Sequence, residues 1–351
     1  MKQIFTLFIL ITSFVLHGQT YTNAESAEYD PVNDQWLVSN GSNIIADDGN
    51  GNLSFFGSAS ANTGMEVLNG ILFAVDGMDI AGYDLATANE VMRLTITGAP
   101  FLNGLTNDGN STLYVTDFTT RTIYAVDVSD ISNPFYVEFV SDTINAPNGI
   151  IYDAANNRLI YVCWGTNAAI RAVDIATQDV SLIINSGITN LDGIDDDAEG
   201  NYYISSWTPD QIIKYNSDFS ASEVIPTPSL NSPADIGYNQ ATDIIAIPMF
   251  TDVIFYDNST LGLGEKKSEG FSIVPNPIDA SHRFSIALGA SQLEKLEVFD
   301  ITGKKVSAIR YEEDATGIVS FSLRDHSLKS GVYMVKLTTE EGIFFEKLAV
   351  R

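Results

Sequence analysis

The sequence of 351 residues contains a single cysteine, Cys163. One cysteine cannot form an intramolecular disulfide, so the stability of the folded chain has to come from packing. Cys163 lies in the segment Leu-Ile-Tyr-Val-Cys-Trp at residues 159–164, which is typical of a buried strand. This setting favours a packed thiol, with a reactive thiol as the alternative.

Histidine is equally scarce, since the three histidines are His17, His282 and His326. No histidine therefore lies between residues 18 and 281, where most of the chain is. This absence argues against a Ser-His-Asp triad and against zinc held by imidazole or thiolate groups. Ions that prefer oxygen ligands remain compatible with the sequence.

Long hydrophobic runs are also absent, apart from one at residues 4–16. This run follows Lys2 and ends just before Gly18, and it is shorter than the roughly 20 residues that a membrane helix needs. The pattern predicts a cleaved signal peptide at residues 1–18, with a membrane helix as the alternative. We therefore expect an exported protein with no transmembrane helix in the mature chain.

Basic residues are rare in the first part of the chain. Residues 1–258 contain six of the 18 basic residues and 32 of the 45 acidic ones, whereas residues 259–351 contain 12 and 13. This change of composition near Ser259 predicts two domains. Such an acidic first domain repels nucleic acid and attracts cations, although solubility alone is an alternative reason for its charge.

A repeat of about 44 residues runs through the first domain. Asn103-Gly104, Asn148-Gly149 and Asp192-Gly193 are spaced by 45 and 44 residues, and each pair precedes runs rich in Val, Ile and Tyr. Three weaker copies occupy residues 24–39, 63–84 and 232–256. Short strands separated by Asn, Asp and Gly turns, four to a repeat, are typical of propeller blades. The sequence predicts an all-β fold, with a six-bladed β-propeller at residues 19–258 followed by a small β-sandwich.

Oxygen-bearing side chains recur where each repeat begins. Because the first strand of a blade lies innermost, we expect these residues to face the channel: Glu25, Thr63, Asn103, Asn148, Asp192 and Asp235. Carboxylate and amide oxygens are ligands that Ca²⁺ prefers. Asn-Gly and Asp-Gly are also common turn dipeptides, which is the alternative reading of each pair alone. Their recurrence at one phase of the repeat favours a shared metal site.

The second strands of the blades should end at the same rim as the first strands begin. We expect the following residues to line this mouth and to contact a substrate or other small organic ligand: Asp76, Asp117, Phe118, Trp164, Trp207, Asp235 and Phe250. Packing of the aromatic rings between blades is the alternative.

The segment Glu-Ser-Ala-Glu-Tyr-Asp-Pro at residues 25–31, the two Asn-Gly openings and Asp192-Gly193 resemble the senescence-marker-protein/gluconolactonase family of six-bladed propellers. The resemblance covers about residues 21–258. It implies one divalent cation, Ca²⁺ foremost with Mn²⁺ or Zn²⁺ as alternatives, bound by four ligands: Glu25, Asn103, Asn148 and Asp192.

The same resemblance implies a metal-dependent hydrolase that acts on a lactone or a related ester, with Asp192 as the catalytic group that moves a proton. Phe101 stands where sugar-lactonase members carry arginine, which argues against a sugar-acid lactone. The alternative function is a non-catalytic propeller that binds a ligand or partner and keeps a structural cation. We expect a monomer in either case.

The end of the chain resembles a second family. Residues 271–351 contain four segments, at 271–277, 296–306, 328–337 and 347–351, whose order and spacing are similar to a type A C-terminal sorting domain of type IX secretion. The resemblance implies recognition by the secretion machinery and a sorting peptidase, and a secreted or surface-attached product. Residues 259–270 should form the linker. An adhesive module of similar fold is the alternative.

Overall fold

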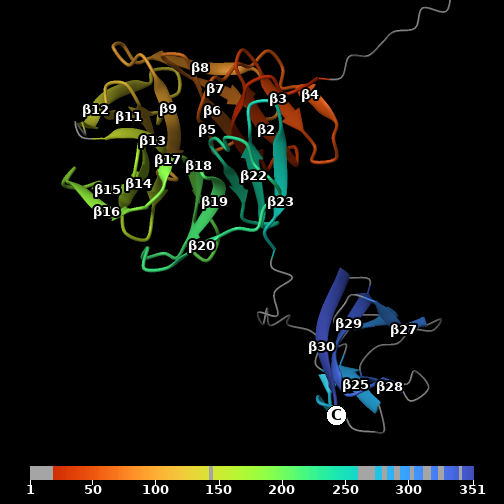
Figure 1. The fold of residues 1–351 in the computed structure, drawn as a ribbon. Coiled ribbons are helices and arrows are strands. Elements are labelled where there is room, and N and C mark those ends of the chain that lie inside the picture. Colours follow the sequence, from red (N-terminus) through yellow and green to blue (C-terminus); the bar gives the residue numbers. More distant parts are fainter. Residues whose placement is uncertain are drawn as a thin grey trace, which may run out of the picture. The chain divides into compact units, whose positions relative to one another are not determined.

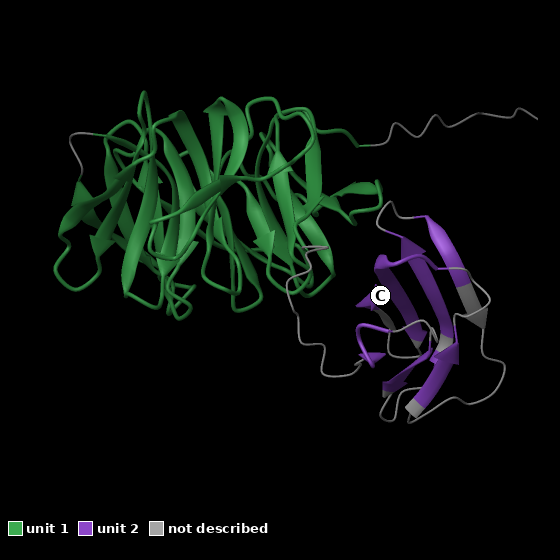
Figure 2. Ribbon diagram, turned by 60° about the horizontal axis from the view of Figure 1, so that its bottom comes forward, with its two compact units in different colours: residues 1–259 green, residues 260–351 purple. Residues whose placement is uncertain are grey.

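A computed structural model describes residues 19–141, 145–259, 273–278, 283–287, 293–300, 304–310, 318–322, 328–339 and 342–351. These residues form strands and turns and divide into two compact units, at residues 1–259 and 260–351 (Figure 2). The predicted signal peptide and all of the predicted linker except Ser259 lie outside the described residues. Within the described ranges, no helix has the length and apolar character that crossing a membrane would require.

The first unit consists of six antiparallel sheets, which are the predicted blades. Blades 1 and 2 contain β1 (Ala24–Asp30), β2 (Gln35–Asn40), β3 (Ile44–Asp47), β4 (Leu53–Phe55), β5 (Met65–Leu68), β6 (Ile71–Asp76), β7 (Asp79–Asp84) and β8 (Glu90–Thr95). Blades 3 and 4 contain β9 (Leu102–Asn107), β10 (Thr112–Asp117), β11 (Thr122–Asp127), β12 (Phe135–Ser141), β13 (Ala146–Asp153), β14 (Arg158–Trp164), β15 (Ala169–Asp174) and β16 (Val180–Asn185). Blades 5 and 6 contain β17 (Thr189–Asp196), β18 (Tyr202–Thr208), β19 (Asp210–Tyr215), β20 (Ser222–Val224), β21 (Gly237–Asn239), β22 (Ile244–Pro248) and β23 (Val253–Asp257).

Blade 6 differs from the prediction of four strands per repeat, because its described sheet has three strands, β21, β22 and β23. The unit ends at Ser259, two residues after β23. Too few residues remain in the unit for a fourth strand.

The blades form a closed ring, seen in Figure 1 with the inner strands toward its centre. Each of the inner strands β1, β5, β9, β13, β17 and β21 contacts the next, and β21 contacts β1. The ring is closed by backbone hydrogen bonds from Ala24 to the Phe250 carbonyl (2.6 Å), from Phe250 to the Ala24 carbonyl (2.9 Å) and from Asp235 to the Glu25 carbonyl (2.8 Å). The N-terminal strand therefore joins the last blade to the first.

The hydrophobic core of the ring lies between blades, not in one central cluster. Each pair of neighbouring blades shares its own group of buried side chains, including Leu37 with Leu72 between blades 1 and 2, and Trp36 with Ala246 between blades 6 and 1. Cys163 is fully buried in the core between blades 3 and 4. This arrangement confirms the predicted propeller, since every blade buries both faces.

Three glycines allow the inner strands to approach one another at the centre. A Cβ atom at Gly104 would lie 2.6 Å from the Asn148 carbonyl oxygen, and one at Gly149 would lie 2.5 Å from the Asp192 carbonyl oxygen. A Cβ at Gly193 would lie 2.6 Å from the Asp235 Cα. These separations are too short for any side chain, which explains the glycine that follows the polar residue in these three repeats.

The second unit is a small sandwich of two antiparallel sheets. One sheet contains β24 (Ile273–Val274), β25 (Arg283–Ala287) and β28 (Ile318–Ser322), and the other contains β27 (Lys305–Arg310), β26 (Leu293–Asp300), β29 (Gly331–Thr339) and β30 (Gly342–Val350). Phe284 and Phe321 of the first sheet pack with Leu296 and Val335 of the second in one buried core. The predicted C-terminal sandwich is therefore confirmed.

Candidate functional site: the propeller channel

The inner strands are irregular where each repeat begins. In β17, Leu191 pairs with Ser206 and Ile194 pairs with Ile204, so three residues of the inner strand span two of its partner. The same shift occurs in β1, β9 and β13. Such a bulge interrupts the alternation of side chains between the faces of a sheet. Residues three apart, such as Asp192 and Asp195, can therefore both face the channel.

The residues that open the repeats form a mouth ring around one end of the channel: Glu25, Thr63, Asn103, Asn148, Asp192 and Asp235. Several of them reach the next blade through hydrogen bonds. The Asn103 amide donates to the Asn148 side-chain oxygen, Asn148 donates to the Leu191 carbonyl (3.1 Å), and the Thr63 hydroxyl donates to the Leu102 carbonyl (3.0 Å). Blades 2 to 4 thus contribute neutral groups to the mouth ring, whereas blades 5, 6 and 1 contribute carboxylates.

The three mouth-ring carboxylates influence one another. Burial raises the pKa of Asp192 to about 8, with a further increase from Asp235, while the Trp207 indole and the Asn148 amide act in the opposite direction. Burial raises the pKa of Asp235 to about 7, against a lowering hydrogen bond from Ser26. Burial, then Asp192 and then Asp235 raise the pKa of Glu25 well above its usual range. The cluster therefore favours protons or other cations.

One oxygen and one N–H group of this cluster have no hydrogen-bond partner among the described residues. Glu25 Oε2 and Trp207 Nε1 are both fully buried and unpaired by hydrogen-bond geometry. The Trp207 indole nevertheless lies close enough to Asp192 to lower its pKa. Buried polar atoms without partners are uncommon in native proteins, and an absent ion is one explanation for an orphaned carboxylate oxygen.

A second group of carboxylates, the inner ring of Glu28, Glu66 and Asp195, lies three residues further along the same strands. Burial, together with Asp235, raises the pKa of Glu28 to about 8, against a lowering hydrogen bond from the Val67 backbone. Burial also raises the pKa values of Glu66 and Asp195, and Glu28 adds to both shifts. This ring was not predicted from the sequence, because strict alternation along a strand places residues three apart on opposite faces.

Hydroxyl groups of the second strands hold the bulges in place, and they too were not predicted. The Thr116 hydroxyl accepts a hydrogen bond from the Gly104 N–H (2.9 Å) and donates to the Asn148 carbonyl (2.7 Å). In the same way, the Ser205 hydroxyl accepts from the Gly193 N–H (2.7 Å) and donates to the Ala234 carbonyl (2.7 Å). These contacts link neighbouring blades directly behind the mouth ring.

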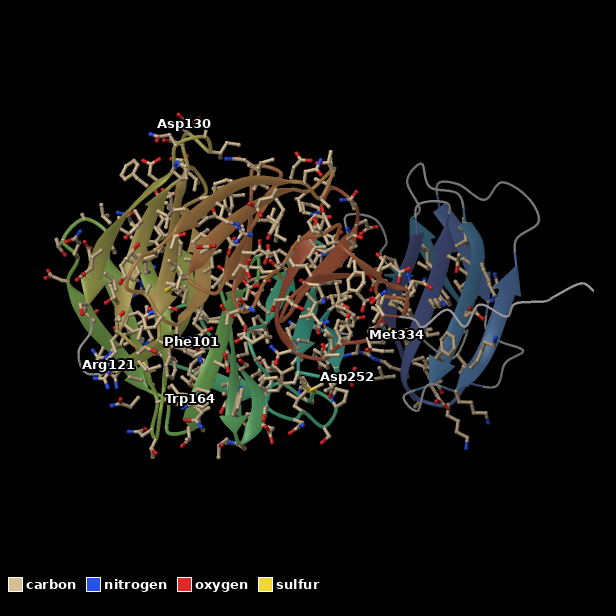
Figure 3. The ribbon with its side chains drawn as sticks, turned by 90° about the horizontal axis from the view of Figure 1, so that it is seen from above. Phe101, Arg121, Asp130, Trp164, Asp252 and Met334 are labelled. Carbon is tan, nitrogen blue, oxygen red and sulfur yellow. The ribbon has the colours of Figure 1, made fainter. Side chains whose placement is uncertain are left out.

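Aromatic side chains form a continuous arc at the mouth. Ring centroids lie 5.5 Å apart for Phe101 and Phe118, 6.2 Å for Phe118 and Trp164, 5.0 Å for Trp164 and Trp207, and 5.5 Å for Trp207 and Phe250. Figure 3 labels Phe101 and Trp164 within this region. The aromatic arc spans blades 3 to 6 and contains the four predicted aromatic mouth residues. It also contains Phe101, which was not predicted to lie at the mouth.

Of the three carboxylates predicted at the mouth, Asp235 belongs to the mouth ring, and Asp76 and Asp117 are engaged in other contacts. Asp76 accepts hydrogen bonds from the Ser60 hydroxyl (2.7 Å) and from Arg93 (2.9 Å). Asp117 is fully buried, and its carboxylate accepts hydrogen bonds from the Thr120 N–H (2.6 Å) and the Phe101 N–H (3.3 Å). Both carboxylates are therefore already engaged in hydrogen bonds with nearby groups.

The four predicted ligands come from blades 1, 3, 4 and 5, and the mouth ring brings them to one end of the channel. No group of three or more His, Cys, Asp or Glu side chains among the described residues is arranged to hold a metal ion. A cation at the mouth ring would therefore need amide oxygens, or water, beside the carboxylates.

The chain is thus a β-propeller with a C-terminal β-domain. Residues 272–351 match the family model described as a secretion system C-terminal sorting domain. This match confirms the predicted sorting domain and indicates export by type IX secretion to the cell surface or beyond. No curated protein matches the chain significantly.

Solved structures resemble the chain at low sequence identity. PorZ, a surface component of the type IX secretion system of Porphyromonas gingivalis, is 15% identical with a TM-score of 0.46, over 96% of this chain and 53% of PorZ, so the chain spans about half of PorZ. A Bacteroides thetaiotaomicron protein of unknown function is 11% identical with a TM-score of 0.55, over 69% of this chain and 71% of that one. A chain of the nidogen/laminin complex is 10% identical with a TM-score of 0.53, over 82% of this chain and 97% of that one. The last two likenesses support the fold alone.

Proposed function

We propose that the exported propeller binds a divalent cation, Ca²⁺ foremost, at its mouth ring. Glu25 and Asp192 would supply carboxylate oxygens, and Asn103 and Asn148 would supply amide oxygens. The orphaned, fully buried Glu25 Oε2 is the observation that carries this proposal. Burial of a carboxylate near Asp192 and Asp235 is unfavourable without a compensating positive charge, and a hard cation with oxygen ligands would provide it.

Two buried acids elsewhere in the propeller differ from the mouth-ring carboxylates, and the difference supports the proposed cation site. Asp153 is buried but pairs with Arg158 at 2.7 Å, and Asp197 is buried but lies 3.4 Å from Lys214. The pKa values of both carboxyl groups are lowered by hydrogen bonds and by these partners, against the effect of burial. The mouth-ring carboxylates have no such basic partner in the described ion pairs.

Calorimetry of the full chain, first stripped with EDTA and then titrated with Ca²⁺, tests the proposal. Ligand at 100 times its dissociation constant stabilises a folded protein by about 2.7 kcal/mol, which corresponds to a shift of roughly 5 to 11 °C for a domain of this size. Glu25→Gln should remove most of the shift, whereas Glu223→Gln, at an exposed position in β20, should retain it. An unchanged unfolding temperature across millimolar Ca²⁺ would contradict the proposal.

Hydrolysis of a lactone or related ester is the finer form of this proposal, in keeping with the resemblance to the senescence-marker-protein/gluconolactonase family. A bound divalent cation would supply Lewis acidity. Asp192, with its pKa raised by burial to about 8, would accept a proton from an attacking water near neutral pH. Asn148 lies beside Asp192 and would help to orient it.

A panel of lactones and aryl esters, assayed with Ca²⁺, Mn²⁺, Zn²⁺ or chelator, separates catalysis from simple binding. Asp192→Asn should abolish any metal-dependent turnover while the unfolding transition of the propeller is kept. Hydrolysis rates that do not change with any substrate or ion would favour the non-catalytic function, in which the propeller binds a ligand or partner on its rim.

A further inference from the structure

The aromatic arc lies outside the buried cores between blades, although its rings contact one another from blade to blade. None of its five rings belongs to the buried cores that join neighbouring blades. Phe101 is 44% exposed, and Phe118, Trp164, Trp207 and Phe250 are half-buried. Apolar surface that remains accessible and continuous across four blades is typical of a binding site.

Carboxylates accompany the arc along the channel. Six carboxylates line it, three in the mouth ring and three in the inner ring: Glu25, Glu28, Glu66, Asp192, Asp195 and Asp235. The described ion pairs of the propeller occupy Arg93, Arg158 and Lys214 with other carboxylates. No described ion pair therefore neutralises a channel carboxylate.

The arc and the carboxylates meet at Trp207. Its ring lies 5.0 Å from Trp164 and 5.5 Å from Phe250, and its buried, unpaired N–H lies toward Asp192. Glu25, whose pKa is raised in part by Asp192, has a fully buried Oε2 without a partner among the described residues. A ligand seated against the arc would thus present its polar end to carboxylates.

We infer that the channel mouth binds an organic cation, a quaternary or protonated amine with an apolar body. The faces of tryptophan and phenylalanine rings attract such cations, with tryptophan the strongest, and the carboxylates beneath them provide the complementary charge. A neutral ligand of the same shape would gain the apolar contact alone.

This inference goes beyond the proposed metal site and does not require it. A divalent cation bound by the mouth ring would not be coordinated by Glu28, Glu66 and Asp195, so these acidic groups would remain beside the mouth. Binding of the organic cation is therefore measured both in EDTA and in Ca²⁺. A protein that binds the amine but not Ca²⁺ would contradict the metal site only. A protein that binds Ca²⁺ but not the amine would contradict this inference only.

Choline and its neutral isostere 3,3-dimethylbutan-1-ol are the matched probes, because they differ in charge and little in shape. Two of the three tryptophans, Trp164 and Trp207, lie in the arc, and Trp36 is buried between blades 6 and 1. Intrinsic fluorescence of the full chain should therefore report binding. We expect a saturable change with choline, at an affinity at least about tenfold above that of the alcohol, and weaker binding at higher salt.

Substitutions then locate the site by isothermal titration. Trp164→Leu should weaken choline binding about tenfold, whereas Phe135→Leu, at a 56% exposed aromatic residue on the outer strand β12, should leave it unchanged. Equal affinity for choline and the alcohol, a Trp164→Leu variant that binds choline normally, or no saturable signal with 100 mM choline would each overturn the inference. Saturable binding of a neutral sugar such as glucose in place of choline would also contradict it.

Discussion

Buried acids are treated differently in the two units. Glu297 in the sorting domain is 5% exposed, and its carboxylate lies 2.9 Å from Lys295 and 3.0 Å from Lys305, whose hydrogen bonds lower its pKa. Glu25 in the propeller has a fully buried oxygen without a partner, and burial raises its pKa. The acid of the sorting domain has lysine partners, whereas none of the described ion pairs includes a channel acid. This difference supports the proposal that the channel binds a cation.

The largest expected effect tests whether the channel depends on close approach of the inner strands. Gly149→Ala places a Cβ atom 2.5 Å from the Asp192 carbonyl oxygen, so neighbouring inner strands would have to separate. We expect a loss of about 3 kcal/mol, or roughly 6 to 12 °C in the unfolding temperature of the propeller. Gly331→Ala in the sorting domain is the matched control, because its nearest neighbour would be 3.8 Å away. Equal unfolding temperatures of the two variants would contradict this account of the repeat glycines.

The pH dependence of stability should differ between the channel and the paired acids. The pKa values of Glu28 (about 8), Asp192 (about 8) and Asp235 (about 7) are raised, so the folded propeller binds more protons than the unfolded chain above about pH 4. These groups therefore make stability fall as pH rises from about 5 to 8. Calorimetry in EDTA at pH 5, 6, 7 and 8 should show the propeller transition moving to lower temperature.

The contribution of Glu297 to the stability of the sorting domain changes with pH in the opposite direction. Its pKa is lowered, so this contribution is lost as the pH falls through that pKa. Saturating Ca²⁺ should weaken the fall in propeller stability between pH 5 and 8, since a cation favours the charged carboxylates. A propeller transition in EDTA that is constant or rises over this range would contradict the raised pKa values of the channel.

The smallest effects are expected from neutralising one acid in each unit. Glu28→Gln should stabilise the cation-free propeller at pH 8 by about 1 kcal/mol, because it removes one of the repelling charges near Asp235. Glu297→Gln should destabilise the sorting domain by less than about 1 kcal/mol, since its lysine partners are largely hydrated. Urea titrations at pH 8 measure both changes. The same sign for both variants would remove the distinction between the two kinds of buried acid.

Much of the fold could be predicted because each repeat carries a glycine at a position that only glycine can occupy. The glycines at 104, 149 and 193 stand where any Cβ would meet the next blade, so their spacing marks the blades. The polar residue before each glycine lies in the innermost strand of its blade, and the mouth ring was predicted from this phase of the repeat. The three strands of the described sheet of blade 6 could not be predicted from the repeat, because the number of strands there depends on where the chain leaves the unit.

The rest of the site depends on backbone irregularity and on contacts between blades. The bulges of the inner strands carry Glu28 and Asp195 to the channel, but a bulge leaves no distinctive residue beyond the glycine that also serves close packing. The sequence could not show that the carboxylates of Asp76 and Asp117 are engaged in hydrogen bonds. Their partners Ser60, Arg93 and Thr120 come close to them only in the folded propeller. Phe101 joins the arc through Phe118, a neighbour 17 positions later in the chain.

A crystal structure of the full chain soaked with Mn²⁺, recorded at a wavelength where manganese scatters anomalously, tests the central claim most directly. The account predicts an anomalous peak on the channel axis at the mouth ring, with oxygen atoms of Glu25 and Asp192 within about 2.0 to 2.6 Å. A mouth ring that contains water alone, with Glu25 Oε2 still unpaired at saturating metal, would contradict it.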